Sequence, residues 1–119
     1  MNNLVNRISF LLLVDSIMVS FDFLMDILPQ SIGPIVKEGL IGTICTVIQE
    51  NMQYTELAGQ AAKLFIKISK ELPDEILKSC ALSTLMGTFD FFDQHAQQKV
   101  LELCLNVSRH ASSEDQFNN

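Results

Sequence analysis

Residues 61–73 read Ala-Ala-Lys-Leu-Phe-Ile-Lys-Ile-Ser-Lys-Glu-Leu-Pro, and the apolar side chains in this stretch recur with the spacing of an α-helix. The helix should end before Pro73, because proline cannot continue a helix and restrains the residue that precedes it. The same pattern occurs twice more along the chain. Residues 17–29 match it at an offset of 44, and residues 100–111 match its first twelve positions at an offset of 39. The sequence therefore indicates a repeated helical unit.

The matched positions are the ones that a helix would turn toward a core. The first offset pairs Phe21 with Phe65, Leu24 with Ile68 and Leu28 with Leu72, and the second pairs Leu64 with Leu103 and Ile68 with Val107. A second set of apolar positions matches at an offset of 41, pairing Ile41, Ile44 and Ile48 with Leu82, Leu85 and Phe89. Periods of about 40 to 47 residues with two or three helices are typical of armadillo and HEAT repeats.

We therefore expect an all-α fold, an armadillo/HEAT-like α-solenoid fragment of about two and a half repeats. The turn signals at residues 28–34 and 72–74 predict helices over 3–13, 15–28, 34–50, 54–72, 74–92 and 94–110. The chain is expected to form one domain, 1–119, divided into a partial unit 1–28, units 29–72 and 73–111, and the start of another at 112–119. Because the units at 1–28 and 112–119 are incomplete repeats, we expect a fragment of a larger protein. Its uncapped repeat ends should favour self-association.

The composition narrows the function classes. Hydrophobic residues make up 48% of the chain and charged residues 18%, which indicates a folding sequence rather than a disordered one. Fourteen acidic residues against eight basic ones give a net charge of −6. A surface of this sign repels phosphates, so nucleic acid is not an expected partner.

The apolar N-terminal stretch predicts a soluble helix rather than a membrane span. Asp15, Asp22 and Asp26 interrupt it, and each acid costs about 2.5–3.5 kcal/mol at the centre of a bilayer. They fall on one helical stripe, opposite an apolar stripe formed by Ile17, Met18, Phe21, Leu24, Met25 and Leu28. With no targeting segment evident, we expect an intracellular protein of the cytoplasm, the nucleus or both, without a membrane partner.

The cysteines and histidines predict neither a metal site nor a catalytic one. Cys45, Cys80 and Cys104 each lie in an apolar helical pattern, so we expect three reduced core thiols that lack nucleophilic reactivity. No two of them are close enough to form a zinc-ligand pair, and His95 and His110 stand 15 residues apart. No catalytic residue, cofactor or metal is therefore expected within this stretch.

Candidate binding residues lie on the polar stripes of the three long helices, which line a concave groove in armadillo solenoids. These candidates are Asp22, Asp26, Lys63, Lys67, Lys70, Glu102, Asn106 and Arg109. These stripes form ridges that are acidic on the first long helix, basic on the second and mixed on the third. The basic ridge should therefore attract acidic or C-terminal carboxylate groups. Reversing all three lysines should then alter binding and spare the fold. Two alternatives are an ordinary solvated face and ridges that pair with each other.

Four runs resemble a known family when taken in order. They are Phe-Leu-Met-Asp-Ile-Leu-Pro-Gln-Ser at 23–31, Ala-Gly-Gln-Ala-Ala-Lys-Leu at 58–64, Phe-Asp-Phe-Phe-Asp-Gln-His-Ala-Gln-Gln at 89–98, and Ser-Glu-Asp-Gln-Phe at 113–117. Together they are similar to the armadillo-like region of HECT-type ubiquitin-protein ligases of the ubiquitin-fusion-degradation and thyroid-receptor-interactor type. The resemblance implies a non-catalytic segment that recognises a substrate degron or ubiquitin, in a parent protein whose distant HECT domain transfers ubiquitin.

Two other functions compete with this interpretation. One is a free-standing helical scaffold or adaptor with no link to ubiquitin. The other is a peptide-binding module like that of the importin-alpha family, which uses Trp and Asn on successive third helices. Asn106 resembles that asparagine, but Glu102 occupies the corresponding tryptophan position and the chain contains no Trp. A cation-stacking aromatic ladder is therefore absent, and the importin-like interpretation ranks third.

Overall fold

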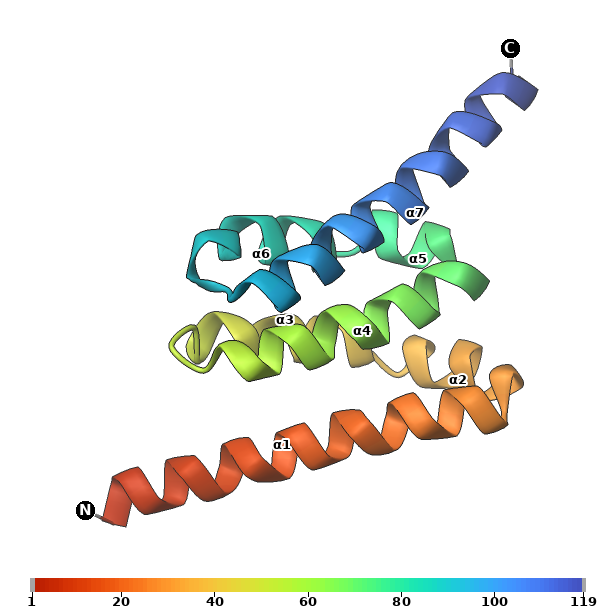
Figure 1. Ribbon diagram of the computed structural model, residues 1–119. Coiled ribbons are helices and arrows are strands. Elements are labelled where there is room, and N and C mark those ends of the chain that lie inside the picture. Colours follow the sequence, from red (N-terminus) through yellow and green to blue (C-terminus); the bar gives the residue numbers. More distant parts are fainter. Residues whose placement is uncertain (1, 119) are drawn as a thin grey trace.

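The structure, a computed structural model, describes the backbone of residues 2–118 and the side chains of residues 3–111. Every regular element of this part of the chain is helical, so the predicted all-α class is confirmed. In chain order the elements are α1 (Asn2–Ile27), the 3-10 turn η1 (Pro29–Ser31), α2 (Ile32–Lys37), α3 (Leu40–Glu50), α4 (Thr55–Glu71), α5 (Pro73–Lys78), α6 (Ala81–Gly87), the 3-10 turn η2 (Phe89–Phe91) and α7 (Gln94–Asn118) (Figure 1).

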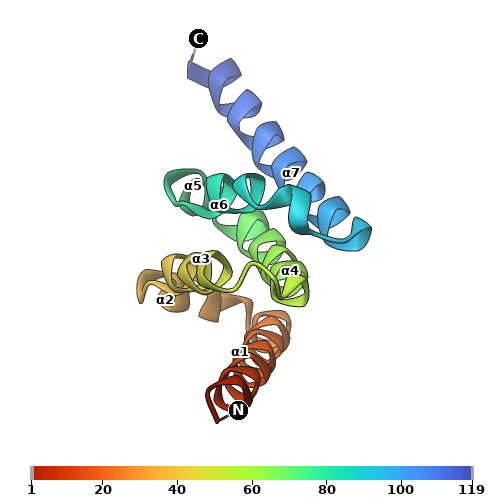
Figure 2. The same cartoon turned by 90° about the vertical axis from the view of Figure 1, so that its left-hand side faces the viewer.

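The helices form two layers. The three long helices α1, α4 and α7 stack on one side, and the short helices α2, α3, α5 and α6 lie on the other (Figure 2). After α1, the order of two short helices and one long helix occurs twice. The chain is elongated, with extents of 59 × 32 × 21 Å and a radius of gyration of 14.9 Å. A compact domain of this length has a radius of gyration of about 13.5 Å.

The core is centred on α4, which packs between α1 and α7. Leu64, Phe65 and Ile68 of this helix are fully buried, and so are Val100 and Leu103 of α7. These residues belong to the matched positions of the repeat. Their periodicity therefore identified the central core correctly.

Helix α1 differs from the prediction in two respects. It is one continuous helix from Asn2 to Ile27, where two helices were expected, because no Gly or Pro lies between these residues to end it. It also lacks a single apolar stripe. Only Leu11, Met18 and Met25 are buried, whereas Ile17 and Leu28 of the predicted apolar stripe are exposed. Apolar residues therefore surround most of the helix.

Segment Asn3–Ile27 is long and apolar enough to cross a membrane when judged by length and composition, and 17% of its most apolar window is buried. The bent pair formed by Pro29–Lys37 and Leu40–Glu50 passes the same test together. Core helices of soluble proteins can be equally long and apolar, but such helices are mostly buried, whereas this one is not. The prediction that the chain lacks a membrane partner therefore stays a prediction.

Two predicted helices are broken in the structure. The helix expected over 34–50 is interrupted at Gly39, whose φ of 95° is in the left-handed region that favours glycine. The helix expected over 74–92 ends at Ser79, where the backbone is extended and the hydroxyl accepts a hydrogen bond from the Ala81 N–H. Helix α7 instead continues to Asn118. The predicted unit start at 112–119 lies outside the described side chains.

Replacing Gly39 with alanine should lower the free energy of unfolding by about 1–2 kcal/mol. A Cβ atom at this position would meet no heavy atom within 4 Å, so the cost comes from the backbone conformation alone. Gly42→Ala is the matched control, because Gly42 is helical with equally open surroundings and alanine is the better helix former there. Urea midpoints should move in opposite directions for the two variants. A shift in the same direction would contradict the role given to Gly39.

Candidate functional site

The polar face of the long-helix layer carries one row of residues per helix. The spacing within each row alternates between three and four residues, which keeps the row on one side of its helix. The α1 row is Asp15, Val19, Asp22 and Asp26, the α4 row is Glu56, Gln60, Lys63, Lys67 and Lys70, and the α7 row is His95, Lys99, Glu102, Asn106 and Arg109. All eight candidate residues belong to these rows.

The acidic row of α1 and the basic row of α4 meet each other. The Nζ atom of Lys67 lies 3.0 Å from Asp22 Oδ2 and 2.6 Å from Asp26 Oδ2, and it donates a hydrogen bond of 2.9 Å to the backbone carbonyl of Asp22. Lys63 Nζ lies 3.7 Å from the same oxygen of Asp22. The alternative in which neighbouring ridges pair therefore describes these four residues. They link α1 to α4, and Asp22 and Lys67 are mostly buried in this contact, whereas the side chains of Lys63 and Asp26 are 55% and 63% exposed.

The environment of Lys67 favours its charged form. Partial burial by itself would lower the pKa of Lys67, but the hydrogen bonds and charges of Asp26 and Asp22 outweigh it and raise that pKa above its ordinary value. Asp22 is the more buried acid, with 14% of its side chain exposed against 63% for Asp26. Its Oδ1 atom is buried without a hydrogen-bond partner among the described residues. Asp22 thus depends on Lys67 for its charge compensation.

The other candidate residues have few partners. Glu102 pairs with Lys99 of its own helix at 3.6 Å, and Asn106 is half-buried. Lys70 and Arg109 are exposed, and neither makes an ion pair with any described residue. At this end of the layer, Lys70 and Arg109 are therefore the cations open to an acidic partner.

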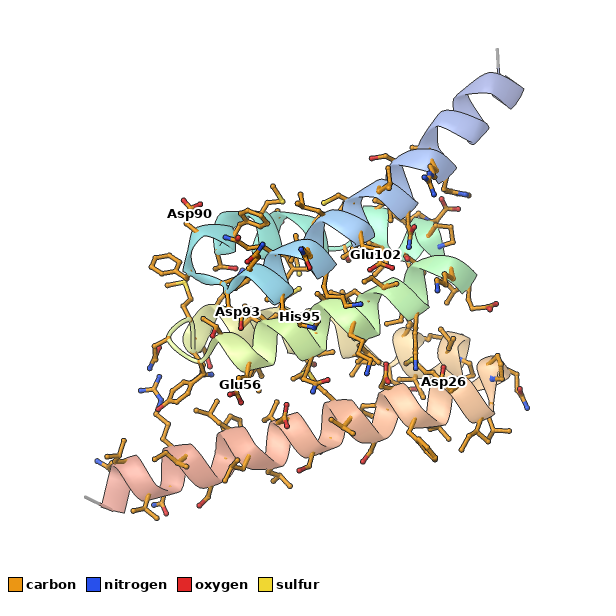
Figure 3. All side chains as sticks on the ribbon, in the orientation of Figure 1. Asp26, Glu56, Asp90, Asp93, His95 and Glu102 are labelled. Atoms are coloured by element: carbon orange, nitrogen blue, oxygen red, sulfur yellow. The ribbon has the colours of Figure 1, made fainter. Side chains whose placement is uncertain are left out.

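The opposite end of the long helices forms a groove of about 300 Å³. Figure 3 shows Glu56, Asp93 and His95 around the first turns of α4 and α7, far from Asp26. The groove contains both charge signs and is lined by Asp15, Thr55, Glu56, Gly59, Gln60, Lys63, Asp93, His95, Ala96 and Lys99. Of these residues, only Lys63 is among the candidates predicted from the sequence. Extending the candidate rows from Lys63 and Glu102 by about two turns toward the N-termini of α4 and α7 would have found Glu56, Lys99 and His95.

The cysteines only partly follow the prediction. All three are free, and Cys45 is buried, but Cys104 is half-buried and Cys80 is exposed. Cys80 was expected in the core because the helix was drawn through it, whereas it lies in the break before α6. Burial, with a further contribution from the neighbouring Cys80, raises the pKa of Cys45 to about 12, and burial also raises the pKa of Cys104. Neither buried thiol is therefore suited to act as a thiolate nucleophile at neutral pH.

The described residues contain no group of three or more His, Cys, Asp or Glu side chains arranged to hold a metal ion. The long-helix face presents charged and amide groups in rows, which are groups that can form ion pairs and hydrogen bonds with another molecule. Ion pairs between such side chains and a partner mainly confer specificity and speed association.

Two known proteins resemble this chain. Over 92 residues it is 26% identical to the E3 ubiquitin-protein ligase UPL4 of Arabidopsis thaliana, a match that covers 77% of the chain and 6% of that ligase. Over 91 residues it is 29% identical to the E3 ubiquitin-protein ligase UPL3 of the same plant, covering 76% of the chain and 5% of the ligase. The chain is related to a segment of ubiquitin ligases. No family model and no solved structure matches it.

The similarity supports the ubiquitin-ligase part of the resemblance noted in the sequence. The chain spans about one-twentieth of the length of the relatives that it matches. The activity, substrates and partners of a whole ligase therefore do not transfer to it directly. Protein partners in general are what a relationship to ubiquitin ligases implies.

Proposed function

We propose that this chain is a non-catalytic recognition segment of a HECT-type ubiquitin ligase and that it holds a substrate degron or ubiquitin. The similarity to two ubiquitin ligases over three quarters of the chain carries the proposal. Two of the three thiols support a non-catalytic role, because burial raises the pKa of Cys45 and Cys104. In this proposal the segment acts in the cytoplasm, the nucleus or both.

The recognition surface in this proposal is the long-helix face of an armadillo-like solenoid. The twice-repeated order of two short helices and one long helix supports that architecture, as do the matched sequence offsets. Unpaired charges remain at both ends of the face, because the central lysines and aspartates compensate each other. The open cations Lys70 and Arg109 suit an acidic segment or a C-terminal carboxylate, and the groove at the other end contains mixed charges.

The proposal is tested by titrating the full chain with ubiquitin and with an acidic peptide that has a free carboxylate, using isothermal calorimetry. The double variant Lys70→Glu/Arg109→Glu should weaken binding of the true ligand about 10-fold or more, because two attractive charges become repulsive. Lys37→Glu is the matched control, since Lys37 is an exposed cation of α2 in the other layer. Equal affinities for both variants, or binding of neither ligand, would contradict the proposal.

A further inference from the structure

Helix α1 exposes apolar side chains at positions where the corresponding residues of α4 are buried. At the offset of 44, Leu13 corresponds to Leu57 and Ile17 corresponds to Ala61. Leu13 is 58% exposed and Ile17 is 45% exposed, whereas Leu57 and Ala61 are 4% and 0% exposed. Among the described residues this side of α1 is therefore uncovered, whereas the corresponding side of α4 is covered.

The uncovered side of α1 forms one wall of an apolar groove, and α3 forms the other. The groove has a volume of about 260 Å³. It contains no charged residue and is lined by Phe10, Val14, Ile17, Met18, Phe21, Leu40, Thr43, Ile44, Val47, Ile48 and Leu57. A groove of this composition favours an apolar helix over a charged peptide.

The structure shows what fills the equivalent groove one unit further along. Helix α6 corresponds to α3 at the offset of 41, so the groove between α1 and α3 corresponds to the one between α4 and α6. Helix α3 packs against both α4 and α6 and fills that second groove. The contact includes a hydrogen bond of 3.1 Å from Gln49 Nε2 to Thr84 Oγ1, and Thr84 corresponds to Thr43 of the open groove. An element that occupies the groove between α1 and α3 should therefore be a helix with the pattern of α3.

The chain carries one further helix of that pattern, namely α6. Met86 of α6 corresponds to Cys45 of α3, and Met86 is 49% exposed where Cys45 is 2% exposed. The adjacent helix α7 also exposes an apolar side chain at a position that is buried in its counterpart α4. Its Leu101 is 54% exposed, and the corresponding Ala62 of α4 is fully buried. The outer surface of α6 and α7 is thus the counterpart of the surface that α3 and α4 present to the next unit.

We propose that two copies of this chain associate head to tail, with α6 and α7 of one copy docked on the α1–α3 groove of the other. Met86 would then enter the partner copy's groove beside Thr43, as Cys45 lies beside Thr84. Because each copy uses two different surfaces, the contact is heterologous and can be repeated by a third copy. The proposal rests on the repeat correspondence between the two units.

Sedimentation velocity of the full chain across a concentration series tests the proposal. The weight-average mass should rise with concentration beyond that of a dimer. Ile17→Glu in the groove and Met86→Glu on α6 should each weaken association about 10-fold or more, because each buries a charge in an apolar contact. Phe23→Glu is the matched control, since Phe23 is a 65% exposed aromatic of α1 outside the groove. Far-UV circular dichroism should show that all three variants stay helical.

Mixing the two defective variants separates head-to-tail packing from the alternatives. Each variant keeps one intact surface, so the mixture should form 1:1 heterodimers and nothing larger. If Met86→Glu associates normally while Ile17→Glu does not, the copies pair through α1 alone and the proposal is wrong. The proposal is also overturned if the chain stays monomeric at every concentration. The same holds if that monomer binds phosphatidylcholine vesicles through α1 and floats with them.

Discussion

Phe65→Ala should lower the free energy of unfolding by about 3–5 kcal/mol. The Phe65 side chain is fully buried in α4, the helix that packs against both α1 and α7. Removing its ring would leave a cavity in the core around α4. The fully buried neighbours Leu64 and Ile68 are held on the same helix, so the surroundings are poorly placed to collapse into that space.

Chemical denaturation followed by circular dichroism measures this effect. Phe23→Ala serves as the control, because it removes the same ring from a position that is 65% exposed, and it should change stability by less than about 0.5 kcal/mol. A loss below about 1 kcal/mol for Phe65→Ala would mean that the phenylalanine does not fill the core around α4. Similar losses for both variants would lead to the same conclusion.

The core was predictable from the sequence because its signal is local and repeated. The matched positions Phe65, Ile68, Leu103 and Val107 all lie in the interior, and Pro29 and Pro73 mark the ends of long helices as expected. A helical period reports which side chains share a face, and in a layered helical fold one face of each central helix must be buried. The division into repeat units stays a prediction.

The misplaced elements depend on information that periodicity does not contain. The break at Gly39 requires a positive φ, which the sequence permits at any glycine but imposes at none. Helix α1 was divided at Asp15, but the acid is half-buried within a continuous helix and the chain has no breaker there. Cys80 was placed in the core because an uninterrupted helix was assumed. At Gly39 and Cys80 the local pattern allowed both possibilities, whereas the continuity of α1 follows from the absence of a helix breaker.

The sequence predicted the candidate site as rows of polar side chains on the long helices. The ion pairs between neighbouring rows became visible only in the structure. Helical projection placed Asp22, Asp26, Lys63 and Lys67 on exposed stripes, but it does not give the distance between stripes on neighbouring helices. Contact between α1 and α4 brings these charges within 2.6 to 3.7 Å. These four candidate residues therefore contribute mainly to the contact between α1 and α4. The test of ligand binding accordingly uses Lys70 and Arg109.

Lys67→Glu should lower the free energy of unfolding by about 2–4 kcal/mol. The substitution removes the cation that compensates Asp22, which is mostly buried, and puts a third carboxylate beside Asp22 and Asp26. Breaking a buried ion pair costs about 3–5 kcal/mol, and the exposure of Asp26 to solvent reduces that figure here. Reversing Lys63, Lys67 and Lys70 together, which the sequence suggested would spare the fold, should therefore destabilise it through Lys67.

Lys70→Glu is the matched control for this prediction, because it makes the same change one turn further along α4 at an exposed position without an ion pair among the described residues. It should alter stability by less than about 0.5 kcal/mol. The double variant Asp26→Lys/Lys67→Glu restores opposite charges and should recover part of the loss, and 1 M salt should reduce the penalty of the single variant.

The pH dependence of the Lys67 contribution follows from the direction of its pKa shift. Since the folded chain raises the pKa of Lys67 above the ordinary value of 10.5, the stabilisation is fully present below that pH and is lost as the pH rises past the folded value. The difference in urea midpoint between the parent chain and Lys67→Met should accordingly stay constant from pH 7 to pH 9. A difference that already disappears within this range, or equal stabilities of Lys67→Glu and Lys70→Glu, would show that the ion pairs do not hold α1 against α4.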